Sequence, residues 1–262
     1  MCKLGGVLFA IVISQINMLF AFVEEKKFYS QYQQDQYVYE NFFKNKKNGI
    51  FVDIGAHDGI TLSNTYFFEK NMGWTGICVE PIPEVYNRLK DNRSCLCIQG
   101  CISDNQERVS FLKISGWAEM LSGIIENYDP QHVKRIHWEI NLNGGQSEII
   151  NVKCYNLTEL LIDNHIQHVD YLSIDTEGGE LGILQSIDFS RIDIDVIEVE
   201  NNYHGPFQAF LEPLGYRKIC DLGPDEIYQK IKGTPHEDKK VSSIFNIVYP
   251  LIGSFILARF KL

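Results

Sequence analysis

Short apolar segments alternate with segments of helical periodicity along most of this chain, and that alternation constrains its fold more than any other feature. In the first half we expect strands at 50–54, 76–80 and 95–101, separated by helices at 63–72 and 83–91. Strands joined by a helix run parallel, because a helical crossover carries the chain back to the edge from which it started. The first half therefore predicts a parallel sheet with helices packed against it.

The second half repeats the pattern and then ends it differently. We expect, in order, strand 108–115, strand 148–154, helix 157–166, strand 169–175, helix 179–187, strand 194–200 and helix 206–214. The last two strands, 216–221 and 225–230, follow each other too closely for a crossover and should form an antiparallel hairpin. The whole pattern predicts a Rossmann-like α/β fold with a mostly parallel sheet, helices on both faces and a C-terminal antiparallel hairpin.

The same pattern sets the domain boundaries. The alternation extends over residues 28–230, which we interpret as one domain. Within it, residues 116–147 show little periodicity, and an irregular stretch of that length inside a compact domain is usually a lid or an insertion. Residues 231–240 are polar and are expected to be a linker.

Apolar segments flank this domain on both sides. The leader, residues 1–24, contains an apolar run at 4–23 that is long enough to span a bilayer and also fits a signal peptide. We favour an uncleaved anchor. The C-terminal segment, residues 241–262, is mainly apolar over 241–258 and is a candidate for a second membrane-associated helix, although Pro250 disfavours a straight span.

Composition argues against nucleic acid and against a cysteine-bound metal. The chain has 24 Lys and Arg against 34 Asp and Glu, a formal net charge of −10, and its basic residues are not clustered as phosphate binding requires. Cys95, Cys97 and Cys101 lack C-x-x-C spacing. We expect these three as core thiols on one face of a single strand, since free cysteine is among the most buried residue types.

The loop "GIFVDIGAHDGIT" should form the binding site at the end of the first strand. Asp53 ends that strand, and Gly55 and Gly59 permit a tight turn into the next helix. A dinucleotide loop has a third glycine where His57 stands, and Asp58 adds negative charge beside it. A pyrophosphate would be repelled, whereas S-adenosylmethionine carries an ammonium and a sulfonium. For His57 a structural role in the turn is slightly favoured over a catalytic one.

The next two strand ends supply further candidates for the same ligand. Glu80, followed by Pro81, ends the second strand, where a carboxylate can accept both hydroxyl groups of a ribose. Cys101, Ile102 and Ser103 end the third strand and could border the adenine ring. A strand end of this composition needs no ligand to explain it, so the third strand is the weaker signal.

Four separated segments resemble the FkbM-type S-adenosylmethionine-dependent methyltransferases. They are "FVDIGAHDGITLSNTYFFEKNMGWTGICVEP", "EMLSGIIENYDP", "VDYLSIDTEGGEL" and "VIEVENNY", and the resemblance runs from about Tyr29 to Tyr228. It implies a seven-stranded class I methyltransferase sheet and methyl transfer to a hydroxyl, often on a sugar or polyketide-like acceptor. It also implies cofactor contacts from Gln34, Asp35, Ser63 and Asn64.

A second group of acids follows the strand after the insertion. Methyl transfer is an in-line displacement, so the acceptor oxygen must lie about 3 Å from the methyl group, and a positioned base adds about 10²–10⁴-fold. Asp175 is expected to be that base or to contact the cofactor ammonium, with Glu177 as the next candidate and His204 as an alternative. Both acids precede a helix, and capping that helix is the competing explanation.

Acceptor and metal ligands are expected from neighbouring positions. Glu200 and Asn201 end the strand 194–200 and should line the acceptor pocket. Carboxylate oxygens suit hard cations, so Glu200 could also hold Mg²⁺ together with the two acids of the preceding strand end. From the insertion we expect Trp117 and Met120 to contact the acceptor, since an aromatic ring can stack on a sugar.

Two other functions remain open. One is a nucleotide-dependent oxidoreductase, which the acidic loop disfavours. The other is a non-catalytic, membrane-tethered protein that keeps the fold, because fold alone does not imply activity. An active enzyme needs its cofactor, so we expect the catalytic domain to face the cytoplasm, with the secretory pathway as the alternative.

Overall fold

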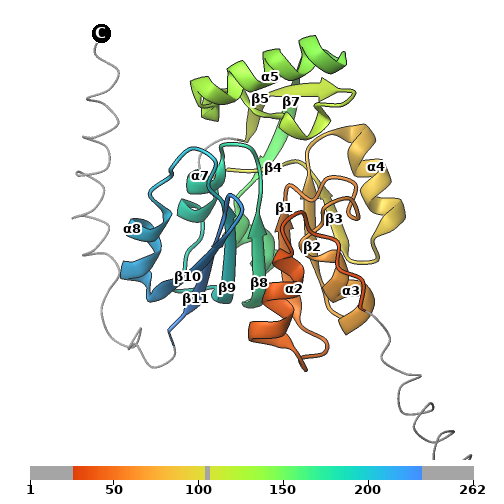
Figure 1. The fold of residues 1–262 in the computed structure, drawn as a ribbon. Helices are drawn as coiled ribbons and strands as arrows, with labels where there is room; N and C mark the ends of the chain where they lie inside the picture. The colour runs from red at the N-terminus through yellow and green to blue at the C-terminus, as the bar shows by residue number, and fades with distance from the viewer. Residues whose placement is uncertain (1–25, 104–106, 232–262) are drawn as a thin grey trace, which may run out of the picture.

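Seven strands form one sheet in the computed structural model, which describes residues 26–103 and 107–231 (Figure 1). The strands are β1 (Ile50–Ile54), β2 (Thr75–Glu80), β3 (Leu96–Gln99), β8 (His168–Ile174), β9 (Asp193–Glu200), β10 (Tyr216–Leu222) and β11 (Asp225–Lys230). Their order across the sheet is β10-β11-β9-β8-β1-β2-β3. All neighbours are parallel except β11, which runs antiparallel to both β9 and β10. The expected mostly parallel sheet with a terminal hairpin is confirmed.

The order of the strands creates a switch point beside β1. From β1 the chain adds β2 and β3 on one side, and it later adds β8 and β9 on the other. The loops that leave β1 and β8 therefore diverge in opposite directions over the carboxyl edge of the sheet. Open α/β sheets bind ligands in the crevice that such a divergence leaves.

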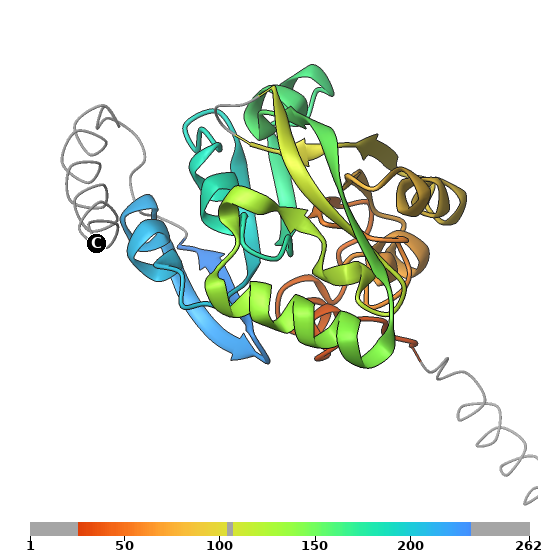
Figure 2. The same cartoon turned by 90° about the horizontal axis from the view of Figure 1, so that it is seen from above.

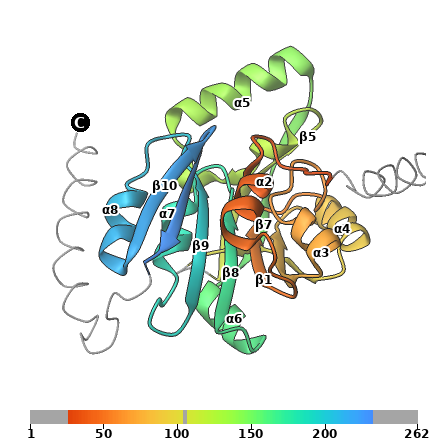
Figure 3. The ribbon, with the colours of Figure 1, turned by 60° about the horizontal axis from the view of Figure 1, so that its bottom comes forward.

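Helices cover both faces of this sheet. They are α2 (Gln34–Val38) with a following π-helical turn (Tyr39–Phe43), α3 (Tyr66–Met72), α4 (Pro83–Asn92), α6 (Leu157–Asp163), α7 (Glu180–Gln185) and α8 (Phe207–Leu211), which lies beside β10 (Figure 3). Alternate side chains of β1 point to opposite faces. Val52 and Ile54 pack in a core with α6, α7 and α8, and Phe51 packs in a second core with α2 and α3.

The region expected to be irregular, 116–147, is instead part of an ordered insertion. A second, four-stranded sheet has the order β4-β7-β5-β6, formed by β4 (Cys101–Ile102), β5 (Arg108–Ser115), β6 (Gly123–Ile124) and β7 (Gln146–Tyr155). Helix α5 (Pro130–Asn143) packs on it through Ile136 and Ile140. The start of α5 was recognisable, because Asp129 accepts a hydrogen bond from Gln131 N and Pro130 occupies the first turn.

One strand that was expected in the main sheet belongs to the insertion. The segment 148–154 belongs to β7, which pairs antiparallel with β5 and not with the main sheet. Figure 2 looks down on the result: α5, in light green, crosses the molecule from the blue hairpin toward the red N-terminal part. The insertion therefore lies over the carboxyl edge of the main sheet.

The expected single strand 95–101 is two strands. The chain turns at Gly100, where a Cβ atom would lie 2.6 Å from the backbone oxygen of Lys153, and only then enters β4 of the second sheet. Cys101 packs in a different core from the other two cysteines of the segment. The expectation that the three share one strand face is therefore wrong.

The proposed membrane segments cannot be followed in the structure. In the ranges 26–103 and 107–231, no helix combines the length and apolar character needed to cross a bilayer. The segments 4–23 and 241–258 lie outside the described residues, as does nearly all of the linker.

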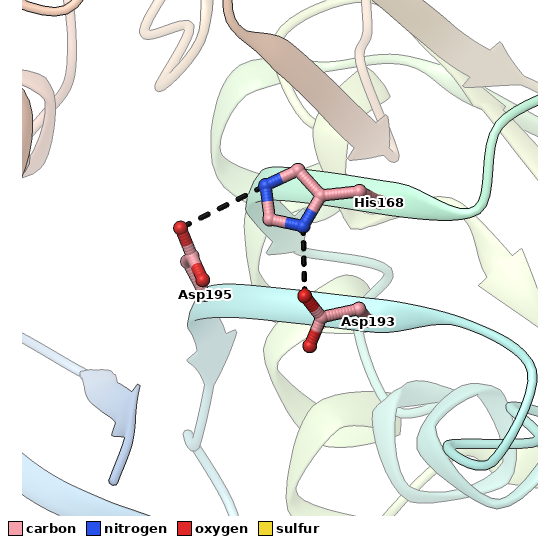
Figure 4. Close-up of side chains that lie close together, drawn as sticks. All are labelled: His168, Asp193 and Asp195. Carbon is pink, nitrogen blue, oxygen red and sulfur yellow. Dashed lines mark hydrogen bonds and ion pairs between the residues drawn. The ribbon is translucent and has the colours of Figure 1, made fainter. Parts of the chain in front are cut away.

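A histidine joins β8 and β9 at the opposite, amino-terminal edge of the sheet (Figure 4). His168 Nδ1 lies 2.9 Å from Asp193 Oδ2, and His168 Nε2 lies 3.2 Å from Asp170 Oδ1 and 3.8 Å from Asp195 Oδ2. The ligand atoms of His168, Asp193 and Asp195 lie within 4.8 Å of one another, as in a metal site. However, Lys46 already pairs with Asp170, and a second lysine pairs with Asp193. Three acids thus face two lysines and a histidine whose pKa is raised, which together form an ion-pair network.

Replacing His168 with Gln should reduce the pH dependence of stability. Burial alone would lower the pKa of His168, but hydrogen bonds to Asp193 and Asp170 outweigh it and raise the pKa above 6.5. The stabilisation is therefore complete below about pH 6.5 and is lost as the pH rises through the raised pKa. The free energy of unfolding, measured with urea, should fall between about pH 6 and about pH 8.5, and it should fall more for the unsubstituted protein than for His168→Gln. The exposed His137→Gln is the control, and equal losses in all three proteins would contradict the network.

Candidate active site

A cavity of about 230 Å³ lies at the carboxyl edge of the main sheet. The ends of β1, β2, β8 and β9 form its floor, through residues such as Asp53, Glu80, Asp175 and Glu200. Leu121 and other insertion residues form its cover. The cavity thus occupies the switch point where the fold is expected to bind a ligand.

Close packing of two strand ends shapes the first loop. A Cβ atom on Gly55 would lie 1.8 Å from the backbone oxygen of Asp175, so the ends of β1 and β8 meet only because this residue is glycine. Gly55 has φ 90°, and His57, with φ 49°, keeps the loop in the left-handed region. His57 Nε2 lies 3.0 Å from Glu119 Oε1 in the insertion. The histidine therefore joins the loop to the cover of the cavity.

Asp53 is buried beneath this loop. Thr65 Oγ1 donates a hydrogen bond to its carboxylate, and Arg93 Nη1 lies 3.9 Å away. Burial raises the pKa of Asp53, and the charge of Arg93 offsets only part of that rise. Asp53 lines the cavity, but its position is fixed by these two partners.

Arg93 organises the region below the loop, and the sequence interpretation missed it. It is 5% exposed. Its Nε donates to Glu69 Oε2 at 2.6 Å, its Nη1 to Gly59 O at 3.2 Å and its Nη2 to Thr65 Oγ1 at 3.0 Å. In the segment "KDNRSC" an arginine resembles an ordinary surface residue at a helix end, so no local signal marks its burial.

Arg93→Lys should destabilise the protein strongly. A lysine ammonium cannot reach three partners that the planar guanidinium serves together. Leaving a buried carboxylate without its partner typically costs about 3–5 kcal/mol. Urea unfolding of the cofactor-free protein measures this loss. Arg191→Lys, which alters an exposed pair with Glu159, is the matched control and should cost at most about 1 kcal/mol. Similar losses in the two variants would contradict the role of Arg93.

Glu80 supplies a second buried carboxylate at the cavity. Its Oε1 accepts a hydrogen bond from Ile82 N at 2.8 Å, and burial raises its pKa to about 7. Pro81, Cys101 and Ile102 line the cavity beside it.

Three carboxylates from two strand ends gather on the opposite side of the cavity. The oxygens of Asp175, Glu177 and Glu200 lie within 4.8 Å of one another. Asp175 is surrounded by protein yet open to solvent through the cavity. Burial raises the pKa of Asp175 and raises that of Glu200 to about 11, and the two carboxyls are hydrogen-bonded. These raised pKa values favour the protonated forms of both acids in the cofactor-free protein.

Glu177 differs from these two acids. Its backbone is in the left-handed region, with φ 61°. Burial raises its pKa to about 7, although the positive charge of Arg135 lowers it in part. Its Oε2 is buried, has no hydrogen-bond donor and lies 3.3 Å from His132 Nδ1. Both of these basic residues are on α5, and neither was expected from the sequence.

Most of the expected site residues surround this one cavity. Those that line it are Gln34, Asp53, Gly55, His57, Ser63, Asn64, Glu80, Pro81, Cys101, Ile102, Met120, Asp175, Glu177 and Glu200. They come from segments that are far apart in the sequence. The ends of parallel strands are what bring them together.

The structure places seven other candidates outside the cavity lining: Asp35, Asp58, Gly59, Ser103, Trp117, Asn201 and His204. Most have structural partners of their own. Asp35 accepts from Tyr29 N, and Asp58 accepts from Thr61 N. Ser103 N donates to a backbone oxygen of β7, and Asn201 donates to Glu226. Trp117 is 77% exposed, and His204 is also exposed.

The methyltransferase FkbM domain matches residues 53–219, which is more than half of the chain. The chain belongs to the FkbM methyltransferase family. The match extends from the first cavity residue on β1 to β10, so it includes the insertion and both acidic strand ends. The α/β fold is accordingly the Rossmann-like class I methyltransferase fold, with the seven-stranded sheet described above.

Solved structures similar to this FkbM family member are remote. Methyltransferase FkbM from Methylobacillus flagellatus KT is 13% identical, with a TM-score of 0.41, over 77% of this chain and 48% of that chain. The METTL16 MTase domain is 11% identical, with a TM-score of 0.37, over 75% of this chain and 65% of that one. The chain thus spans about half the length of the solved FkbM protein. A search of curated proteins found no significant match.

S-adenosylmethionine, the cofactor that the family implies, fits the residues present. Asn64 Oδ1 and Glu177 Oε2 are buried acceptors that lack a donor, and both residues line the cavity. The strand ends add carboxylates on both sides of the cavity, whereas Arg135 is the one lysine or arginine among its lining residues in the described part of the chain. A ligand that carries hydroxyl, ammonium and sulfonium groups would satisfy these acceptors and balance their charge.

Proposed function

We propose that this chain transfers a methyl group from S-adenosylmethionine to a hydroxyl oxygen of a sugar or another small or glycan acceptor. The observation that carries the proposal is the set of carboxylates Asp53, Glu80 and Asp175 around one cavity of an FkbM domain. Pyrophosphate would meet these acids and His57 where a dinucleotide fold offers glycine and a helix N-terminus.

Residues at different strand ends have different proposed roles. Glu80 would accept hydrogen bonds from the ribose hydroxyls of the cofactor, and Asp175 with Glu200 would face its ammonium group. The bound cofactor supplies an electrophilic methyl group. The protein mainly aligns the acceptor oxygen with that methyl group, and alignment alone supplies about 7–11 kcal/mol.

Glu177 is the base that the geometry favours. The pKa values of Asp175 and Glu200 are raised strongly by burial, whereas Glu177 lines the cavity with a pKa of about 7 and is partly ionised at neutral pH. A base is most effective when its pKa lies near the working pH. His204 is exposed and outside the cavity lining, so it is the less suitable alternative.

Glu80→Gln should weaken cofactor binding about tenfold to a hundredfold, because hydrogen bonds to a charged acceptor contribute about 1.5–3 kcal/mol. Calorimetric titration with S-adenosylmethionine measures the affinity. Glu84→Gln, at an exposed position in the first turn of α4, is the matched control and should bind normally. Unchanged affinity in Glu80→Gln would remove the ribose contact from the proposal.

Cofactor binding should release protons, and affinity should rise with pH. The acids with raised pKa values hold protons in the free protein, and a bound cation favours their ionised forms. Titrations in two buffers of different ionisation enthalpy, between about pH 6 and about pH 8, measure this release. Glu200→Gln should reduce this release, because it removes one of the acids with a raised pKa. Proton uptake on binding would contradict the expected contact between acid pair and cation.

Magnesium remains a second way to assist the reaction. The three carboxylates have the spacing of a metal site, yet two are hydrogen-bonded to each other and Glu177 faces α5. These contacts favour proton removal by a carboxylate over assistance by Mg²⁺. Methyl transfer that stops in EDTA and recovers with Mg²⁺ would instead assign the metal.

Two competing functions are separated by binding and activity. Tight NAD binding without S-adenosylmethionine binding would indicate an oxidoreductase. Cofactor binding without methyl transfer to any component of a native extract would indicate a non-catalytic protein. The extract is screened with tritiated methyl donor, and labelled products are identified by mass spectrometry.

We also propose membrane association through residues 4–23 and 241–258, with the catalytic domain in the cytoplasm. The support is the length of the two apolar runs and the need for the cofactor. Fractionation with protease protection tests both parts. Protection of the domain inside sealed secretory vesicles would favour the secretory alternative.

A further inference from the structure

A buried histidine of the insertion touches the proposed base. His132, on α5, is 0% exposed. Its Nε2 lies 3.0 Å from the backbone oxygen of Leu121, and its Nδ1 lies 2.9 Å from Tyr203 Oη and 3.3 Å from Glu177 Oε2. The ring of Tyr128 packs against it, with centroids 4.6 Å apart. The imidazole is therefore held in one orientation.

These contacts determine where the ring carries its proton. A backbone oxygen only accepts hydrogen bonds, so Nε2 must be the protonated nitrogen. Burial lowers the pKa of His132, which keeps the ring neutral. Nδ1 is consequently an unprotonated acceptor with one lone pair, within reach of Tyr203 Oη and Glu177 Oε2.

A bare nitrogen facing a carboxylate oxygen has a chemical consequence. The two acceptors attract each other only when a proton lies between them. Nδ1 has a single lone pair, which accepts from Tyr203 in the free protein, while Glu177 Oε2 has no donor. When Glu177 becomes protonated, its O–H can replace that of Tyr203 at Nδ1, and hydrogen bonding to the neutral form of an acid favours that form.

We propose that His132 is a positioning residue for proton removal: its unprotonated Nδ1 orients Glu177 and accepts the O–H of Glu177 after that acid has taken the proton of the acceptor hydroxyl. This inference rests on the proposed function. During transfer the bond from sulfur to methyl breaks, with its electrons remaining on sulfur. The acceptor O–H breaks as the new O–CH₃ bond forms, and the proton moves to Glu177.

The strained backbone of Glu177 supports this role. A non-glycine residue in the left-handed region persists only when its surroundings hold it. Glu177 is 9% exposed, and its contacts reach across to α5, including Arg135 Nη1 at 3.9 Å from Oε2. The insertion thus supplies an orienting group for a base that belongs to the main sheet.

Two substitutions separate this role from simple packing. In His132→Asn, the amide oxygen can replace Nδ1 as the acceptor toward Glu177, while the bond to Leu121 is lost. In His132→Gln, the longer amide can replace Nε2 and keep the bond to Leu121, while the acceptor at Nδ1 is lost. A purely structural histidine would be replaced better by Gln, whereas a positioning histidine would be replaced better by Asn.

The test measures tritium transfer from labelled S-adenosylmethionine into native extract, with cofactor affinity determined by calorimetry. We expect His132→Gln and His132→Ala to lower the maximal rate by about 10²-fold or more with little change in cofactor affinity. His132→Asn should retain most of the rate, and the exposed His137→Asn and His137→Gln should behave as the unsubstituted protein. A higher maximal rate in His132→Gln than in His132→Asn would overturn the proposal. Equal losses of rate in His132→Gln, His132→Asn and His132→Ala would also overturn it.

A second readout does not depend on activity. Nitrogen NMR of ¹⁵N-histidine-labelled protein should show neutral His132 with its proton on Nε2. A proton on Nδ1, or a charged ring at neutral pH, would overturn the proposal even if methyl transfer is observed. Absence of methyl transfer by the unsubstituted protein would contradict the proposed function, and the catalytic role of His132 with it. The wrong tautomer in a protein that does transfer methyl groups would contradict the His132 role alone.

Discussion

The close approach of Gly55 to the backbone of Asp175 is the contact on which the site depends. It brings the end of β1 against the end of β8, so that two loops 120 residues apart in the chain share one wall. A side chain at this position would push the strand ends apart and separate Glu80 from Asp175 and Glu200 across the cavity. Arg93 reinforces the arrangement from below by holding the loop and its following helix together.

Negative charge is the second constraint on the molecule. Burying several carboxylates without cations is unfavourable, and the protein responds by keeping some of them protonated. The free site is therefore an electrostatically strained one, and a cationic ligand relieves that strain. On this view the affinity for the cofactor comes partly from groups that destabilise the empty protein.

The sequence predicts the main sheet well, because strands and helices there follow the periodicities of buried elements. It also predicts that Asp53, Glu80 and Asp175 lie at the site, since the ends of parallel strands meet at one edge of the sheet. It does not predict that His132, Arg135 and Arg93 contribute to the site. Their roles arise from packing between distant segments, and nothing in their immediate neighbours distinguishes them from surface residues. In the insertion, the sequence predicts β5 and most of β7 as strands, but it does not predict that they pair with each other, because that pairing depends on the fold of the segment between them.

The pairing of β4 with β7 gives the insertion a narrow stem. Cys101 and Cys154 lie side by side where the chain enters and leaves it, next to the cavity wall. The strands of the main sheet pair with one another without any strand from beyond this stem, so the insertion can vary in size without altering the order of the main strands. Such variation would change the cover of the cavity, including Leu121 and Arg135, and would leave the strand ends of its floor in place.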